Sequence, residues 1–242
     1  MRESELTSLT TTTATDDSFV QGIKDCLPTL FGYISIGLAF GVVGVASNLS
    51  VLEIALLSIL VYAGSAQFIF CALLLTGSPA SAIMITIFIV NLRHLLMSLS
   101  LAPHFTKYSV LRNIGFGTLL TDETFGVAMT KSLQNGKLYG KWMDGLNVTA
   151  YSFWIASCTI GAFLGQWVAQ PEKWGLDFAL VAMFVALLVL QLQAVGKSKV
   201  MHYIKLICYM ALFMYGLSFI MASHLAVLVA TIIVATIGVL TE

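Results

Sequence analysis

A succession of long apolar segments is the feature that most constrains the fold of this chain. Eight such segments lie at 27–46, 52–76, 80–101, 114–130, 146–169, 176–195, 202–221 and 225–240. Most of them approach the roughly 20 apolar residues that a helix needs to cross a bilayer. Hydrophobic residues make up 58% of the chain and charged residues 10%, against about 45–50% and about 25% in soluble domains. The sequence therefore predicts an all-α polytopic membrane protein with seven or eight hydrophobic segments.

The charge balance and the cysteines exclude other classes of protein. Twelve basic residues balance twelve acidic ones, which argues against electrostatically driven binding of nucleic acid. The four cysteines are scattered singly through apolar runs, without a CxxC pair or a histidine at zinc-ligand spacing. We therefore expect no metal, no cofactor and no nucleic-acid partner. Residues 1–20 are predicted to be a polar flexible tail, and residues 21–242 a single transmembrane domain.

Basic residues indicate which connections face the cytoplasm. Eight of the twelve Lys and Arg residues fall in connections around 102–112, 131–144 and 197–205, and the positive-inside rule makes all three cytoplasmic. The first two connections flank segment 114–130, so we expect this segment to enter and leave on one side as a re-entrant or broken element. Counting three crossings back from 102–112 places the N-terminus outside.

An internal repeat is predicted at an offset of 124 residues. Between residues 36 and 62 this offset gives 7 identities in 27 positions, and it also aligns Gln67 with Gln191. The repeat halves would span about 21–130 and 145–242. Because the first segment is expected to run inward and its mate outward, the halves would be inverted, as in many secondary transporters. Chance matches between apolar segments are the alternative.

The run from Tyr62 to Gln67 interrupts the second apolar segment with small and polar residues. An amide in hydrocarbon needs hydrogen-bond partners, and local unwinding would create a helix N-terminus that is able to receive a carboxylate. Close helix packing through the small residues is the alternative. Together with polar residues of the first and third segments, these form the candidate substrate-binding set: Tyr33, Ser35, Tyr62, Gly64, Ser65, Gln67 and Asn91.

Charged residues inside apolar segments form a second candidate set. Arg93 lies in the third segment, where it either snorkels to the headgroups or pairs with the carboxylates Asp122 and Glu123 of segment 114–130. His94 is either a hydrogen-bonded structural residue or a member of a proton relay. We expect Arg93, His94, Asp122 and Glu123 to couple transport to protons or to gate it.

Four motifs follow one another along the chain: Gly22-Ile23-Lys24-Asp25 with the glycines that follow, Tyr62 to Phe68, Asn91 to Leu96, and Leu120 to Phe125. As a set they resemble the AzlC family, the large subunit of bacterial branched-chain amino acid exporters. The resemblance covers about residues 20–240. It implies a multi-pass protein of the bacterial plasma membrane that exports valine, leucine and isoleucine with a small AzlD-type membrane subunit. The family's functional stretches fall on Gly64–Gln67, Asn91–His94 and Asp122–Glu123.

Three function classes remain open from the sequence. The first is a secondary transporter, for which protons are the expected coupling ion because no GxxxxGK[ST] motif for ATP occurs. The second is an assembly subunit whose polar intramembrane residues bind another chain. The third is an intramembrane hydrolase that uses a buried serine with His94, or the two carboxylates. It lacks both a GxSG-like and an HExxH motif, so we expect the chain not to be an enzyme.

Overall fold

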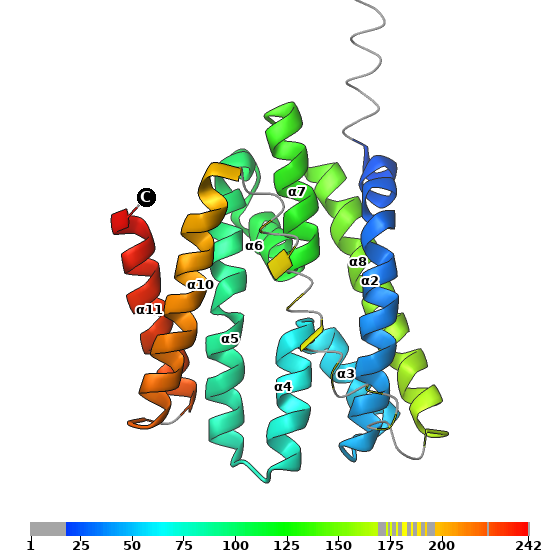
Figure 1. Ribbon diagram of the computed structural model, residues 1–242. Helices are drawn as coiled ribbons and strands as arrows, with labels where there is room; N and C mark the ends of the chain where they lie inside the picture. The colour runs from blue at the N-terminus through cyan, green and yellow to red at the C-terminus, as the bar shows by residue number, and fades with distance from the viewer. Residues whose placement is uncertain are drawn as a thin grey trace, which may run out of the picture. The chain divides into compact units, whose positions relative to one another are not determined.

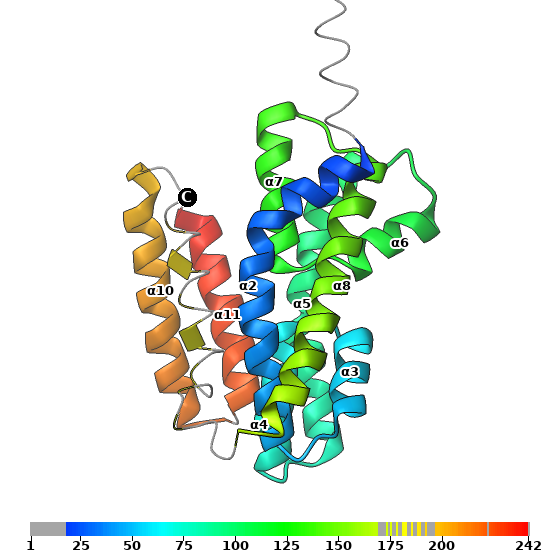
Figure 2. The same cartoon turned by 90° about the vertical axis from the view of Figure 1, so that its right-hand side faces the viewer.

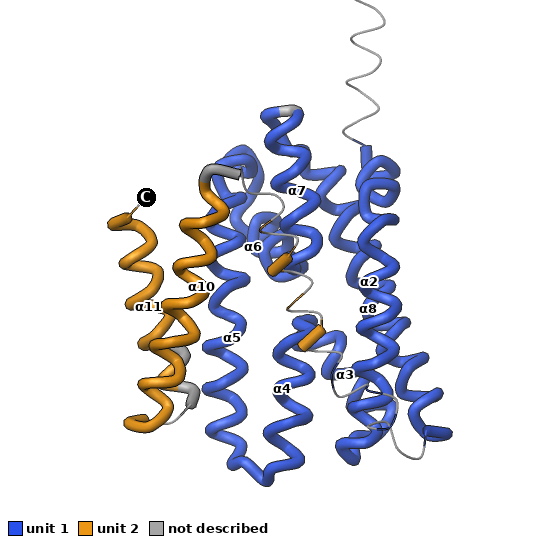
Figure 3. The backbone as a smooth tube through the Cα atoms, in the orientation of Figure 1, with its two compact units in different colours: residues 1–180 blue, residues 181–242 orange. Residues whose placement is uncertain are grey.

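The computed structural model describes residues 18–168, 197–221 and 223–241, together with scattered positions between 173 and 192. The chain forms two compact units, unit 1 at 1–180 and unit 2 at 181–242 (Figure 3). The described residues are helices and connections without a strand, which confirms the predicted all-α fold. Residues 1–17 of the predicted tail and most of segment 176–195 lie outside the described residues.

Two long helices, α2 (Phe19–Ala46) and α8 (Gly140–Gly165), form the scaffold of unit 1 (Figures 1 and 2). Their backbones touch. A Cβ atom added to Gly41 would lie 2.3 Å from the carbonyl oxygen of Cys158, and one added to Gly161 would lie 2.3 Å from that of Leu38. Only glycine permits this approach, and small residues are the usual means of bringing membrane helices together.

The contacts along this helix pair show that α2 and α8 run in the same direction. Gly22 faces Trp142 near the start of both helices, whereas Gly37 faces Ser157 further along. An inverted repeat would require the two helices to run in opposite directions. The inversion predicted for the first segment and its mate is therefore wrong for this pair.

The second apolar segment is a helical hairpin rather than one crossing. It consists of α3 (Val51–Leu60) and α4 (Gly64–Leu75), which at 1.5 Å per residue are only about 15 and 18 Å long. Tyr62 at the turn has a left-handed backbone, with φ 42°. The side chain of Gln67 donates to Ser58 Oγ at 3.0 Å and joins α4 to α3. Both outer ends of the hairpin lie at the same end of unit 1 (Figure 1).

A second hairpin enters unit 1 from the opposite end. This hairpin consists of α6 (Val110–Thr118) and α7 (Asp122–Asn135). It follows the long helix α5 (Ala80–Leu101) and the short 3-10 helix η1 (Ala102–Phe105) along the chain. Arg112 at the start of α6 pairs with Asp144 of α8 at 2.6 Å. Lys131 near the end of α7 pairs with Asp25 of α2 at 3.2 Å. Both outer ends thus lie where α2 and α8 begin, as expected for a re-entrant element.

This arrangement corrects the predicted position of the N-terminus. Because the segment 52–76 turns back, only α2 and α5 run the length of unit 1 between residue 19 and the connection at 102–109. The start of α2 therefore lies at the same end of unit 1 as that connection, and not at the opposite one (Figure 1). We name this end of unit 1 the basic end, because it carries Lys107, Arg112, Lys131, Lys137 and Lys141.

Unit 2 contains a hairpin of two apolar helices, α10 (Lys197–Ser218) and α11 (Ser223–Thr241). Gly238 of α11 lies against Leu206 of α10. Four helical stretches among the described residues are long and apolar enough to cross a membrane: Phe19–Ala46, Ala80–Phe105, Gly140–Gly165 and Lys199–Ser218. The chain is a multi-pass membrane protein in which full-length helices alternate with short paired ones.

The two hairpins make a testable prediction about accessibility. Single cysteines at Lys107 and Lys137, in a chain whose four native cysteines are replaced, should react with an impermeant thiol reagent from one and the same side. A cysteine at Thr76, between α4 and α5, should react from the other side. Labelling of Lys107→Cys and Lys137→Cys from opposite sides would show that α6 and α7 together cross the membrane.

Candidate functional site

The tips of the two hairpins meet at Arg93 of α5. One guanidinium nitrogen, Nη2, donates to Ser65 Oγ in α4 at 2.6 Å, and Nη1 lies 2.9 Å from Asp122 Oδ2 at the start of α7. Arg93 lies eight residues, or about 12 Å, before the end of α5. Of the two alternatives for Arg93, the structure shows the ion pair, and it identifies Asp122 as the partner.

The two helix starts at this meeting point differ in how they are capped. Thr121 caps α7 in a reciprocal capping box with Thr124, and Asp122 and Glu123 occupy the first turn, where the helix dipole stabilises negative charge. The residue before α4 is Ala63, and no side chain caps that helix. The first turn of α4 therefore presents backbone N–H groups that favour an anion.

Glu123 lies in a different environment from its neighbour Asp122. The hydroxyl of Tyr33 in α2 donates to Glu123 Oε2 at 3.2 Å and also hydrogen-bonds the hydroxyl of Thr121. Tyr33 is buried, and its ring stands edge-on to that of Trp154 with centroids 5.7 Å apart. Asp122 is thus held by a cation, whereas Glu123 is held by a neutral hydroxyl.

Gln67 is buried and has partners for both ends of its amide. Its Nε2 donates to Ser58, and its Oε1 accepts a hydrogen bond from Trp154 Nε1 at 2.9 Å. Gly64 packs against the same indole, since a Cβ atom there would lie 3.0 Å from the Trp154 ring. These contacts attach the α3–α4 hairpin to α8. A direct contact between Gln67 and substrate stays a prediction.

The other predicted site residues differ in burial and in their hydrogen-bond partners. Tyr62 is buried at the hairpin turn, edge-on to Tyr151 at 4.8 Å. Asn91 and His94 flank Arg93 on α5 and are partly exposed, and the Oδ1 atom of Asn91 has no hydrogen-bond partner in the described part of the chain. Ser35 is exposed and bonds back to the carbonyl of Phe31, so it does not join the cluster.

We name the central set the tip cluster. It consists of Tyr33, Ser65, Arg93, Thr121, Asp122 and Glu123. Sequence reasoning missed the roles of Thr121 and Trp154. A signal existed for each, because Thr121 stands three residues before a hydroxyl that completes a cap, and an indole N–H inside an apolar segment needs an acceptor. Within the described residues, no group of three or more His, Cys, Asp or Glu side chains is placed to hold a metal.

The fold and the tip cluster define a multi-pass membrane protein with two helical hairpins that meet at a charged centre. The profile of the AzlC family, described as AzlC protein, matches residues 28–168. This is more than half of the chain and includes the whole tip cluster. The chain belongs to the AzlC family, which confirms the resemblance.

Individual relatives are similar over about three quarters of the chain or less. The inner membrane protein YgaZ of Escherichia coli is 32% identical over 183 residues, covering 73% of this chain and 74% of that protein. The branched-chain amino acid transport protein AzlC of Bacillus subtilis is 27% identical over 168 residues, covering 68% and 64%. No solved structure matches this chain.

The ion pair predicts a specific pattern of stability. Arg93→Ala leaves Asp122 without its cation and should lower the free energy of unfolding by about 2–3 kcal/mol, because unpairing a partly buried charge is costly. Adding Asp122→Asn should recover part of this loss, whereas adding Glu123→Gln should not. Unfolding of the purified protein in detergent measures all three variants.

A second ion pair provides the control for this series. Arg112 and Asp144 are 40% and 38% exposed, against 28% and 22% for Arg93 and Asp122. Arg112→Ala should therefore cost only about 1 kcal/mol or less. Two results would contradict the assignment of Asp122 as the partner of Arg93. One is an equal loss of unfolding free energy in Arg93→Ala and Arg112→Ala, and the other is recovery of the Arg93→Ala loss by Glu123→Gln but not by Asp122→Asn.

The Gln67 contacts predict a stability effect that is separate from transport. Gln67→Leu leaves the buried N–H of Trp154 without an acceptor, and we expect it to destabilise the protein by about 1–3 kcal/mol. The matched control is Gln134→Leu, the same exchange at an exposed position of α7. Thermal unfolding in detergent compares the two, and equal melting temperatures would remove the anchoring role of Gln67.

Proposed function

We propose that this chain is a secondary transporter that exports branched-chain and related neutral amino acids. The observation that carries the proposal is the position of one partly buried pair of opposite charges, Arg93 and Asp122, where hairpins from opposite ends of unit 1 meet. Support for the substrate class comes from the name of the Bacillus subtilis relative, a branched-chain amino acid transport protein. That name also favours transport over catalysis.

A zwitterionic amino acid matches this pair charge for charge. Its carboxylate would bind Arg93 and the uncapped start of α4, and its ammonium group would bind Asp122 at the start of α7. The incoming substrate then replaces the internal ion pair without leaving either partly buried charge unpaired, which would be costly. A substrate with a single charge would leave one partner stranded.

The paired hairpins provide a route to alternating access. Each hairpin reaches the tip cluster from one end of unit 1, so withdrawal of one hairpin would open the centre to that end only. Interrupted helices that meet at a central site are a common architecture of secondary transporters. Because α2 and α8 pack backbone against backbone, we expect them to stay fixed while the hairpins move.

Glu123 is the residue that we assign to proton coupling. Its partner Tyr33 is a hydroxyl group, which donates to a carboxylate and accepts from a carboxylic acid. Glu123 can therefore be hydrogen-bonded in both protonation states, whereas the partner of Asp122 is the Arg93 guanidinium, which can only donate. His94, next to Arg93, is the candidate for passing protons between this centre and water.

The proposed transporter acts with a small membrane subunit of the AzlD type, as the family resemblance implies. The competing proposal is an assembly subunit that transports nothing by itself. A hydrolase is less supported, because Ser65 is hydrogen-bonded to Arg93, which is a cation rather than a base. Flux measured with and without the small subunit separates the first two.

Counterflow of labelled valine tests the proposed function. The chain is reconstituted in liposomes loaded with unlabelled valine, with and without the small subunit. We expect uptake of label in at least one preparation, and inhibition by leucine and isoleucine but not by lysine or glutamate. Absence of counterflow for every neutral amino acid in both preparations would remove the transporter assignment.

The division of labour between the two carboxylates makes a further prediction. Glu123→Gln should weaken transport driven by a pH gradient at least tenfold while leaving valine exchange at uniform pH within about threefold, because only the driven process needs a proton carrier. Asp122→Asn should impair both processes. Unchanged pH-driven transport in Glu123→Gln would move the coupling role elsewhere.

A further inference from the structure

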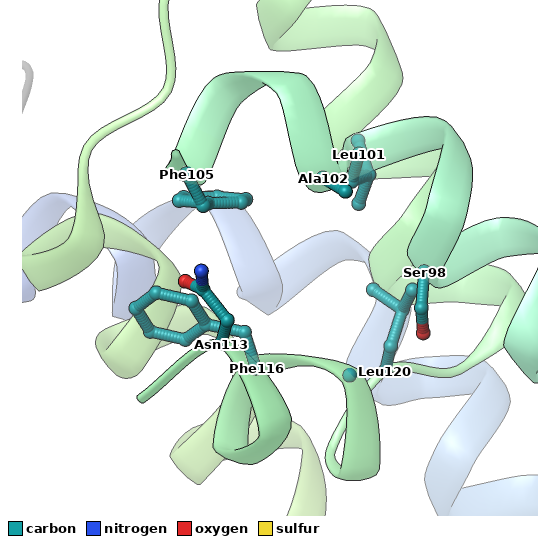
Figure 4. Close-up of a pocket in the computed structure, with 8 residues that line it drawn as sticks. Ser98, Leu101, Ala102, Phe105, Asn113, Phe116 and Leu120 are labelled. Carbon is teal, nitrogen blue, oxygen red and sulfur yellow. The ribbon is translucent and has the colours of Figure 1, made fainter. Parts of the chain in front are cut away.

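A cavity of about 60 Å³ lies between the end of α5, η1 and α6 (Figure 4). It is separate from the tip cluster, and none of the predicted site residues lines it. Its wall consists of Ser98, Leu101, Ala102, Phe105, Asn113, Phe116, Gly117 and Leu120.

The wall of the cavity is largely apolar. Leu101, Phe105, Phe116 and Leu120 are all buried. The hydroxyl of Ser98 is already used, because it donates to the carbonyl of His94 at 2.7 Å. An apolar pocket with few polar groups is the usual form of a site for a small aliphatic group.

One polar atom of the wall has no partner within the described structure. The Oδ1 atom of Asn113 is buried and accepts no hydrogen bond there, and its amide stands beside the ring of Phe105 (Figure 4). Buried acceptors are normally satisfied, so this oxygen is available to a polar group of an occupant.

The position of the cavity connects it to the tip cluster. Ser98 lies five residues after Arg93 on α5, which is about 7.5 Å along the helix axis. Leu120 lies two residues before Asp122 and lines the cavity directly at the break between α6 and α7. The elements that position Arg93 and Asp122 therefore also supply part of the cavity wall.

The size of the cavity sets a limit on its occupant. A water-sized group needs roughly 10–15 Å³ of such space, so the cavity holds about four to six heavy atoms. The side chains of valine, leucine and isoleucine contain three or four carbons, whereas those of phenylalanine and tryptophan are larger than the space. We propose that this cavity is the side-chain pocket that selects branched aliphatic amino acids. This inference rests on the proposed transport function.

Contacts on the far side of α6 keep the pocket in shape. The Arg112 guanidinium lies over the ring of Phe116 at 5.4 Å, and Asn147 of α8 donates to the carbonyl of the same residue at 3.2 Å. Phe116 is thus fixed from outside while its ring lines the pocket. Residues of the wall therefore set substrate size through their own volume.

The test is a change of selectivity in counterflow. Ser98→Leu fills the pocket and should lower the ratio of leucine to alanine transport by roughly tenfold, the discrimination that a few methylene groups provide. Phe105→Leu enlarges the pocket and should admit phenylalanine. The matched control is Ser100→Leu, an exposed serine of α5 whose hydroxyl also donates to a carbonyl four residues back.

The outcomes separate this inference from the proposed function. If the native protein exchanges valine, and Ser98→Leu and Phe105→Leu shift selectivity while Ser100→Leu does not, the pocket assignment is supported. If the native protein exchanges valine but both variants keep the native selectivity, the cavity is a packing or lipid-filled space and the assignment is overturned. If the native protein exchanges no amino acid, the proposed function fails and the pocket assignment fails with it.

Discussion

The need to pair an arginine that lies inside an apolar helix organises the structure of this protein. A guanidinium within an apolar helix is costly unless carboxylate and hydroxyl groups surround it. Arg93 obtains both, from Asp122 on one hairpin and Ser65 on the other. Neither hairpin supplies both groups, so the contact exists only when their tips meet at α5. The charge thereby determines where two short helical pairs end inside unit 1.

The parallel pair of α2 and α8 provides the fixed surface on which the hairpins are held. The α3–α4 hairpin is attached through Gln67 to Trp154, and the α6–α7 hairpin through Thr121 to Tyr33. The two aromatic residues themselves stack edge to face. Each hairpin is therefore anchored to the scaffold as well as to Arg93. The α6–α7 hairpin is held further by the Arg112–Asp144 and Lys131–Asp25 ion pairs at its outer ends.

Local sequence patterns predicted the breaks and the charged centre but not the path of the chain. Small polar residues at Tyr62–Gln67 and the carboxylates of segment 114–130 indicated where helices are interrupted. Hydropathy could not distinguish one crossing of 25 residues from two short helices that turn back, and this error inverted the expected position of the N-terminus. Hydropathy also could not identify which of Asp122 and Glu123 pairs with Arg93. Neighbouring residues of a helix point about 100° apart, and hydropathy does not show which of the two faces α5. Trp154, which donates to the side-chain oxygen of Gln67, lies 87 residues away, beyond any local pattern.

The central claim is that a zwitterion replaces the Arg93–Asp122 pair charge for charge. Competition against labelled valine in counterflow tests it directly, with two analogues that keep the branched side chain but lose one charge, isobutylamine and isovalerate. Both native charges must be matched at once, so unlabelled valine should compete strongly, and neither analogue should compete at the same concentration. Equal competition by the amine or by the acid would contradict charge-for-charge exchange and would place substrate recognition outside the tip cluster.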